Sequence, residues 1–302
     1  IPAATVVGCI LLIWTLAVFP MNAHLAADMA ARGDVVVTPH SPQDRKAMTG
    51  VTIAVKNPVI IAMTYSLDRP RLPSPHQVAV EMHNTIFTVA PTSRRSLVHH
   101  AWVTLSATLL GFVIGTTLGV LLAVGIVYNR TMDKSVMPWA ITSQTIPILA
   151  LAPMIIVMLG AIGIQGLLPK SIISAYLSFF PVVVGMVKGL RSPDAMQLDL
   201  LRTYNANAPQ GFWKLRLPAS MPYLFTSLKI GISAALVGAI VGELPTGARA
   251  GFGARMLVGD QYGQPMVTWA ALFGAAITAA LLVGLISFIE RRTLNRMGMG
   301  AA

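Results

Sequence analysis

The sequence is short of charged residues. Only 11% of its 302 residues are Asp, Glu, Lys or Arg, whereas soluble globular domains carry about 25%. Acidic residues are the scarcer kind, with 11 of them against 22 basic ones. The chain is also 55% hydrophobic, with a mean hydropathy of +0.68. This composition excludes an ordinary soluble globular protein, and it excludes a disordered chain, which would lack apolar residues.

Cysteine is nearly absent. Cys9 stands alone in a hydrophobic run, so the sequence predicts no disulfide framework and no metal site built from cysteines. The histidines all lie in or beside the segment 23–100, and their spacing matches no metal-binding motif. We expect ordinary surface residues rather than metal ligands or proton sensors at these six positions: His24, His40, His76, His83, His99 and His100.

Motifs of catalysis and of nucleic-acid binding are missing as well. The chain has no Gly-x-x-x-x-Gly-Lys-Ser/Thr phosphate loop, no His-Glu-x-x-His and no Gly-x-Ser-x-Gly. Its basic residues flank hydrophobic runs and form no patch with interleaved aromatics. We therefore expect neither an enzyme nor a nucleic-acid-binding protein. Membrane topology and anionic lipid explain the basic excess.

Long stretches without any charge or histidine are what the sequence does have. Four of the six exceed the roughly 20 residues that a helix needs to cross a bilayer. The fourth and fifth reach that length only with their flanks, the fifth by starting near Tyr223 with Lys229 snorkelling to the surface. They predict an all-α membrane protein with six transmembrane helices, the first one retained rather than cleaved as a signal peptide. The six stretches are 1–23, 101–129, 135–169, 171–187, 230–242 and 261–289.

The predicted spans are about 3–22, 101–127, 137–160, 171–189, 222–242 and 267–289. Short loops orient them, because Lys and Arg accumulate on the cytoplasmic side. With a cytoplasmic N-terminus, eleven basic residues fall in short cytoplasmic segments, against Lys170, Arg249 and Arg255 outside. We therefore predict that both termini are cytoplasmic and that the lipid bilayer surrounds the bundle.

Three regions follow from this topology: a first transmembrane helix (1–22), a long outer segment (23–100) and a core (101–302). Within the outer segment, an apolar run is interrupted by Lys56, Asn57 and Pro58. It predicts two short strands, 51–55 and 59–64, around a turn. A re-entrant or seventh crossing is the alternative, and we disfavour it because it would spoil the charge asymmetry.

Small residues four apart mark two of the predicted helices. Such stripes let membrane helices approach closely, and they allow either a sliding interface or static packing. The two stripes are Gly111, Gly115 and Gly119, and Gly231, Ala235 and Ala239.

Prolines and a polar patch mark the third predicted helix. Pro147 and Pro153 remove backbone donors and kink it. Polar side chains at that depth face a partner or a cavity. We expect them to line a solute pathway rather than only to bond neighbouring helices. The pathway candidates are Ser143, Gln144, Thr145, Pro147 and, on the next helix, Tyr176.

The loop 190–221 is the longest predicted cytoplasmic connection, and it carries two amphipathic segments. Ser192, Pro193 and Asp194 are typical of a helix start, with Ser192 as N-cap. Asn205 suits a left-handed stop, and a second segment, 211–217, is expected to end at Pro218. Apolar residues recur on one face of the first segment (Met196, Leu200, Leu201 and Tyr204), with Asp199 and Arg202 on another. Such a pair docks on a soluble partner or rests on lipid.

This loop resembles the EAA motif of ATP-binding-cassette (ABC) importer permeases: Glu-Ala-Ala, three residues, Gly, nine residues, Ile-x-Leu-Pro. Leu217 and Pro218 anchor the alignment, which then places Asp199, Leu200 and Leu201 at the Glu-Ala-Ala positions. Asn205 falls at the Gly and Leu215 at the Ile. Asp keeps the carboxylate and Asn tolerates positive φ. Leu200-Leu201 in place of Ala-Ala departs from the motif, since larger side chains need a deeper groove.

Further motifs resemble the nitrate/sulfonate/taurine-type permeases over most of the chain from Pro73. They are Pro73-Ser74-Pro75, the run from Ile146-Pro147 to Pro153, and Glu243 followed by Gly251-Phe252-Gly253. Each is weak alone, and their order and spacing together are specific. The insertion 23–72 departs from this family.

The resemblance implies a type I ABC importer permease in the bacterial inner membrane. Two permease subunits, expected to be identical, would form the pathway, and a cytoplasmic ATPase dimer would hold ATP and Mg, with no cofactor in this chain. A solute-binding protein would deliver a small polar solute such as a sulfonate, nitrate, taurine or a pyrimidine. A secondary transporter or channel that is not driven by ATP is the alternative function.

The resemblance also assigns roles to single residues. Asp199 and its neighbours Leu200, Leu201 and Arg202 would meet the ATPase, Asn205 would shape the turn, and Leu215, Leu217 and Pro218 would seat the loop. At the outer loop, Glu243, Gly251 and Gly253 would allow the binding protein to dock, or they would form ordinary tight turns.

Overall fold

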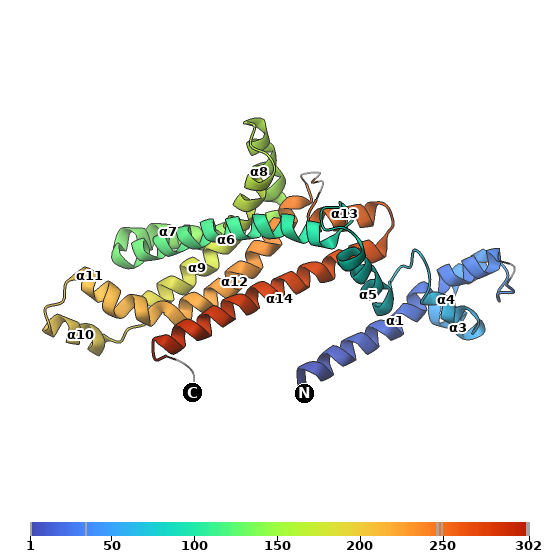
Figure 1. Ribbon diagram of the computed structural model, residues 1–302, viewed down its shortest axis with the longest axis horizontal. Coiled ribbons are helices and arrows are strands. Elements are labelled where there is room, and N and C mark those ends of the chain that lie inside the picture. The colour runs from blue at the N-terminus through green and yellow to red at the C-terminus, as the bar shows by residue number, and fades with distance from the viewer. Residues whose placement is uncertain (1, 34, 246–247, 249, 300–302) are drawn as a thin grey trace. The chain divides into compact units, whose positions relative to one another are not determined.

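The computed structural model describes residues 2–33, 35–245, 248 and 250–299, and these residues form helices and no strands. The chain divides into two compact units (Figure 1). The first unit comprises residues 1–99 and 255–274, and the second comprises residues 100–254 and 275–302.

The first unit is built on one long helix. Its elements are α1 (Pro2–Arg32), α2 (Pro42–Ala47), α3 (Gly50–Lys56), α4 (Ile60–Thr64), α5 (Pro75–His83), the π-helix η1 (Asn84–Thr88), most of α13 (Phe252–Gln261) and the start of α14 (Pro265–Arg296). We predicted that the first helix ends near residue 22, but α1 continues to Arg32. Buried alanines of this extension pack against α3 and α4: Ala23, Ala26, Ala27 and Ala30.

The prediction of two strands in the outer segment is wrong, because both stretches form helices. The side chain of Thr49 caps α3 by accepting a hydrogen bond from the backbone of Thr52. Ile53 and Ile60 are fully buried against α1. Asn57 ends α3 and donates to Thr38 and Ile53 carbonyls, each at 2.8 Å. The β-branched residues favoured strands, but burial against the alanine face of α1 overrides that preference.

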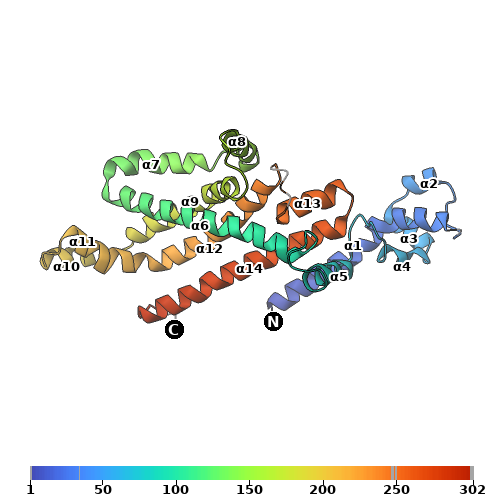
Figure 2. The ribbon, with the colours of Figure 1, turned by 45° about the horizontal axis from the view of Figure 1, so that its top comes forward.

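The second unit holds the remaining helices. They are α6 (Leu97–Tyr128, from residue 100), α7 (Arg130–Ser143), α8 (Ile148–Ala161), α9 (Leu167–Leu190), α10 (Ala195–Thr203), α11 (Ala208–Gly211), the π-helix η2 (Phe212–Arg216), α12 (Leu217–Glu243) and the rest of α14. Among them, α6, α9 and α12 run side by side in Figure 2. Across the described residues, five helices are long and apolar enough to cross a membrane, or six if the bent pair α7–α8 is one span.

The third predicted span is broken rather than merely kinked. Helices α7 and α8 meet at 99°, and Pro147 is the N-cap residue of α8, in an extended conformation. Proline cannot donate the backbone hydrogen bond that would continue α7. Figure 1 shows α8 turned away from the direction of α7. The predicted single helix over 137–160 is therefore wrong, although Pro147 indicated where it breaks, while Pro153 lies inside α8.

The glycine stripe of α6 lies against α9. A Cβ atom on Gly115 would approach the Ser178 hydroxyl to 2.2 Å and the Ala175 carbonyl oxygen to 2.8 Å. Glycine is therefore what allows the two backbones to come this close. The predicted small-residue packing is confirmed, while the choice between sliding and static contact stays open.

Helix α12 packs along α9 through its own small residues. Ala235 and Ala239 are fully buried, and the hydroxyl of Ser174 donates to the Ala235 carbonyl at 2.7 Å. The ammonium of Lys229, which we predicted to snorkel to the surface, lies 2.8 Å from the Glu290 carboxylate on α14. A partner helix thus neutralises this charge.

Candidate functional site

Helix α10, the first of the two loop helices, is fixed by its own caps. Asp194, not Ser192, is the N-cap residue, because Gln197 three residues later completes a reciprocal capping box. Ser192 instead bonds the Gly189 carbonyl at 2.7 Å. The predicted start was therefore two residues early.

The end of α10 forms a Schellman motif. The N–H of Asn205 donates to the Arg202 carbonyl at 2.9 Å, and the N–H of Ala206 donates to the Leu201 carbonyl at 3.0 Å. Asn205 has φ of +52° and is the single non-glycine residue with positive φ among those described. The left-handed stop predicted at Asn205 is confirmed.

The second loop helix continues into the membrane. A capping box of Asn207 and Gln210 starts α11, and η2 connects it to α12 without a break. The N–H of Leu217 reaches back five residues to the Phe212 carbonyl. The predicted stop at Pro218 is wrong, because this wider π-turn just before the proline accommodates the missing donor.

Arg216 attaches this loop to the membrane helices. Its guanidinium donates to the Leu190 carbonyl at the C-terminus of α9 at 2.8 Å and lies 5.8 Å from the ring centre of Tyr128. A cation is favoured at a helix C-terminus. A pocket of about 290 Å³ adjoins this contact, and Leu201, Arg202, Arg216 and Tyr128 contribute to its lining.

Tyr128 and Arg216 were absent from our sequence candidates. Arg216 stands between two motif residues, Leu215 and Leu217, which is the one signal that pointed to it. Leu217, like Phe212, packs against the buried core of the second unit, and Leu215, Leu217 and Pro218 are all half-buried.

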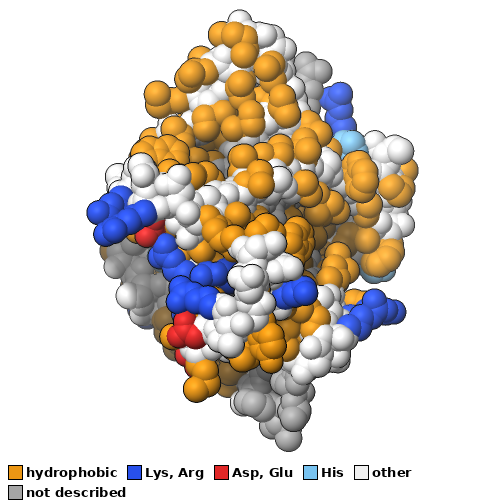
Figure 3. Space-filling view, turned by 90° about the vertical axis from the view of Figure 1, so that its left-hand side faces the viewer, with side chains coloured by type: hydrophobic (Ala, Val, Ile, Leu, Met, Phe, Trp, Pro, Cys, Tyr) orange, Lys and Arg blue, Asp and Glu red, His pale blue; other side chains and the backbone are white. Residues whose placement is uncertain are grey.

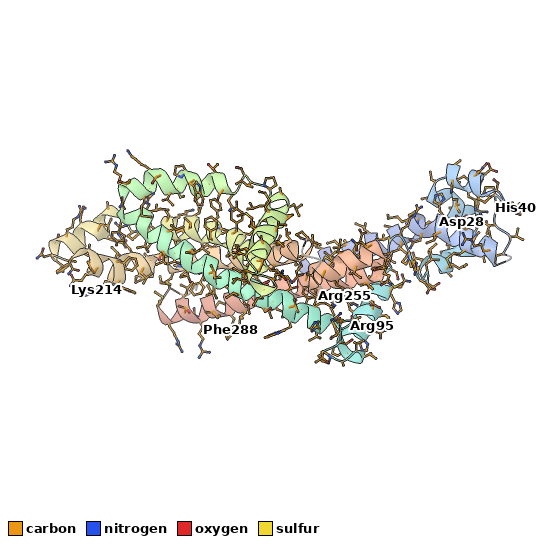
Figure 4. The ribbon with its side chains drawn as sticks, turned by 90° about the horizontal axis from the view of Figure 1, so that it is seen from above. Asp28, His40, Arg95, Lys214, Arg255 and Phe288 are labelled. Atoms are coloured by element: carbon orange, nitrogen blue, oxygen red, sulfur yellow. The ribbon has the colours of Figure 1, made fainter. Side chains whose placement is uncertain are left out.

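The apolar face of α10 is uncovered in the second unit. Met196 is 79% exposed, Leu200 57% and Tyr204 78%. Asp199 lies beside this face and pairs with Arg202 at 2.9 Å, both largely exposed. Lys and Arg side chains gather at this end of the unit (Figure 3). Lys214 lies at the same end (Figure 4). An exposed apolar strip rimmed by polar residues is typical of a protein-interaction site.

The predicted pathway residues come together at the bend between α7 and α8. The hydroxyl of Tyr176 on α9 donates to the Ser143 carbonyl. Gln144 is the C-cap residue of α7, and its buried side-chain nitrogen has no hydrogen-bond partner among the described residues. Thr145 and Pro147 are exposed at the bend. A buried amide without a partner costs free energy, and a polar solute would supply that partner.

Glu243 makes the main polar contacts at the end of the second unit that was predicted to face outward. Its carboxylate is fully buried and accepts hydrogen bonds from the Thr104 hydroxyl and the Gly253 N–H, both at 2.8 Å. The Thr104 hydroxyl in turn accepts from the N–H of Phe252 at 2.9 Å. One carboxylate thus ties α6 and α12 to Phe252 and Gly253 at the start of α13.

His100 differs from prediction, and Lys170, which we counted in a short outer loop, lies in the first turn of α9. His100 is 4% exposed and accepts a hydrogen bond from the Gly251 N–H at 3.0 Å, so it is not the surface histidine we expected. Lys170 is 7% exposed and contributes to the lining of a pocket of about 410 Å³. Arg249, counted with it in the outer loops, lies outside the described residues.

Close contacts with α12 explain why residues 251 and 253 are glycines. Gly251 has φ of +123°, and a Cβ there would lie 2.2 Å from the Glu243 carboxyl carbon. A Cβ on Gly253 would lie 2.4 Å from the Ile240 carbonyl oxygen. Docking of a binding protein at this loop stays a prediction. Within the described residues, no group of three or more His, Cys, Asp or Glu is placed to hold a metal ion.

Comparison with known proteins decides the family. The sequence profile of a family described as binding-protein-dependent transport system inner membrane component matches residues 115–297. The chain belongs to that family. A probable ABC transporter permease of Haemophilus influenzae is 32% identical to the permease described here, over 60% of this chain and 72% of the relative.

Two further relatives carry substrate names. The formylaminopyrimidine transport permease ThiX of Halalkalibacterium halodurans is 31% identical, over 60% of this chain and 68% of ThiX. The riboflavin transport system permease RibX of Chloroflexus aurantiacus is 30% identical, over 73% of this chain and 78% of RibX.

Among solved structures, a chain of the inward-facing MetNI methionine ABC transporter aligns with a TM-score of 0.55. The two are 20% identical, and the alignment covers 66% of this permease and 95% of the MetNI chain. This likeness concerns the fold alone. It confirms the predicted class, an all-α type I ABC importer permease.

Proposed function

We propose that this ABC importer permease docks on a cytoplasmic ATPase through α10 and the start of α11. The uncovered apolar face of α10, held by a capping box and a Schellman motif, carries this proposal. Two fixed ends make the helix a rigid block, and a rigid block transmits movement of the ATPase to the membrane helices. ATP would be bound together with Mg and hydrolysed in the ATPase, because permeases of this family are transport subunits and not enzymes.

A second copy of the permease completes the pathway in this proposal. An extracytoplasmic solute-binding protein delivers the solute, and both termini of the permease lie in the cytoplasm of a bacterial inner membrane. The solute is small and polar, such as a sulfonate, nitrate, taurine or a pyrimidine. The uncharged polar groups at the α7–α8 bend suit such a solute, and ThiX, named as a formylaminopyrimidine transport permease, handles a solute of the same class.

Co-purification with the ATPase tests the docking proposal. We expect Leu200→Asp to remove the ATPase from the purified complex, because the aspartate puts a charge into an apolar contact. Val36→Asp is the matched control, since Val36 is 78% exposed and lies in the outer segment. Equal recovery of the ATPase with both variants would contradict docking through α10.

Uptake measured with a hydrolysis-deficient ATPase separates the two candidate functions. The importer proposal expects uptake to stop. Uptake that continues would instead support a secondary transporter that is not driven by ATP.

A further inference from the structure

A pocket of about 260 Å³ lies in the first unit, outside the region that matches the family. The side chains that line it are His24, Leu25 and Asp28 of α1, Lys46 of α2, and Arg71 of the segment before α5. Asp28 is labelled in Figure 4, on the part of α1 that carries α2 to α4. The pocket thus belongs to the insertion 23–72, for which the family motifs supply no role.

The pocket carries a net positive charge. Its one acid, Asp28, accepts two hydrogen bonds from Arg45, at 2.8 and 3.1 Å. The Arg45 side chain is 5% exposed, and its other terminal nitrogen donates to the Pro39 and His40 carbonyls. Arg45, which does not line the pocket, therefore neutralises the charge of Asp28. Lys46 and Arg71 make no ion pair with any residue that the structure describes, so two cationic groups remain for a ligand.

A buried asparagine holds Arg71 at the pocket. Asn22 is fully buried, and its side-chain oxygen accepts from the backbone N–H groups of Arg71 and Leu72, at 2.9 and 3.1 Å. Its side-chain nitrogen donates to the Thr64 and Leu72 carbonyls. The side-chain amide of Asn22 thus makes four hydrogen bonds to the backbone. Two of them hold the backbone of Arg71 and Leu72 in place, which positions the Arg71 side chain at the pocket.

The position along α1 indicates the depth of the pocket. The charge-free run of α1 ends at residue 23, and His24 and Asp28 follow directly. At 1.5 Å per residue these four steps span about 6 Å. That is about the thickness of one headgroup layer, since headgroups add some 10–15 Å to a 30 Å hydrocarbon core. The pocket therefore begins where the hydrocarbon ends.

We propose that this pocket binds a phosphate-type oxyanion, and that in the membrane the oxyanion is the phosphate of a phospholipid headgroup. Arg71 supplies a planar pair of donors that matches phosphate, and Lys46 supplies a point charge. His24 adds a ring nitrogen to the lining. The insertion then anchors the permease to lipid in the leaflet on its side of the membrane, the outer one in the proposed orientation.

Lipid retention by the purified permease tests the site. Native mass spectrometry counts phosphatidylglycerol molecules that stay bound in detergent. The test variant is Lys46→Ala with Arg71→Ala, and the control is Lys56→Ala with Arg69→Ala, which removes the same charge from exposed positions of the insertion that do not line the pocket. We expect retention to fall at least tenfold in the test variant, about the effect of one charge-assisted hydrogen bond, and to be unchanged in the control.

Inorganic phosphate in place of the lipid distinguishes the two sources of the ligand. Phosphate binding that the test variant loses, without specific lipid retention, supports the oxyanion site and identifies a free anion as its ligand. Lipid retention without phosphate binding identifies the headgroup. Equal retention of both probes by the test and control variants would overturn the proposal. Lys46→Arg with Arg71→Lys keeps both charges and is expected to restore binding, which excludes misfolding as the cause of a loss.

Discussion

The ammonium nitrogen of Lys229 on α12 lies 2.8 Å from Oε2 of Glu290 on α14. Replacing either residue leaves one charge without its partner. The side chains are 30% and 16% exposed, so solvent reduces the effect below that of a fully buried pair. We expect Lys229→Met or Glu290→Gln to lower the free energy of unfolding by about 1–3 kcal/mol.

A double-mutant cycle checks this prediction, with thermal unfolding in detergent as the measurement. Lys229→Met combined with Glu290→Gln removes both charges and is expected to be more stable than the sum of the single losses predicts. Additive losses would show that the pair contributes no coupling energy.

Gly251→Ala tests the turn at the outer loop. Its φ of +123° is strained for any side chain, and a Cβ would collide with the Glu243 carboxyl group. We expect a loss of about 2 kcal/mol or more in unfolding free energy. Gly263→Ala is the control, because Gly263 also has positive φ but a Cβ there meets nothing within 4 Å. Equal losses in the two variants would show that the collision with Glu243 adds nothing.

Gly115→Leu tests the close approach of α6 and α9. The larger side chain would meet Ser178 and the backbone of α9, so we expect α6 to separate from α9 at a cost of about 2 kcal/mol or more. Gly284→Leu, at a position where a Cβ meets nothing within 4 Å, is expected to be nearly neutral. Thermal unfolding of the purified permease compares the two. Similar melting temperatures would contradict tight packing at Gly115.

Asp199→Arg tests coupling to the ATPase. Reversing this charge would place a cation against the basic residue expected on the ATPase, and it would also break the pair with Arg202. We expect at least a tenfold loss of uptake and of ATPase stimulation, with an unchanged melting temperature because the pair is exposed. Asp260→Arg, at an exposed position of α13, is the control. Uptake equal to that of the parent protein would remove Asp199 from this role.

Sequence reasoning succeeded where local rules decide the outcome. The charge-free stretches predicted the spans, because lipid tolerates few other arrangements of backbone. The asparagine at position 205 indicated a left-handed conformation, since asparagine adopts positive φ more readily than most residues. Pro147 marked the break between α7 and α8, but the 99° angle depends on how neighbouring helices pack, and no local signal carries it.

The errors arose where distant segments decide the local structure. The stretches 51–55 and 59–64 form helices because the alanine face of α1 covers them. Arg216 was overlooked because its partner, the Leu190 carbonyl, is 26 residues away in the sequence and lies next to it only in the folded chain. His100 looked like its neighbours in sequence, and burial against the loop at Gly251 distinguishes it.

The absence of a break at Pro218 has a mechanical consequence. From Ala208 to Glu243 the chain is one helical segment of 36 residues, about 54 Å long at the rise of an α-helix. If the ATPase docks as proposed, a tilt imposed at Ala208 would be passed along this continuous helical segment towards Glu243. Glu243 accepts a hydrogen bond from the backbone of Gly253. A movement at the docking helix would therefore displace this backbone at the opposite end of α12.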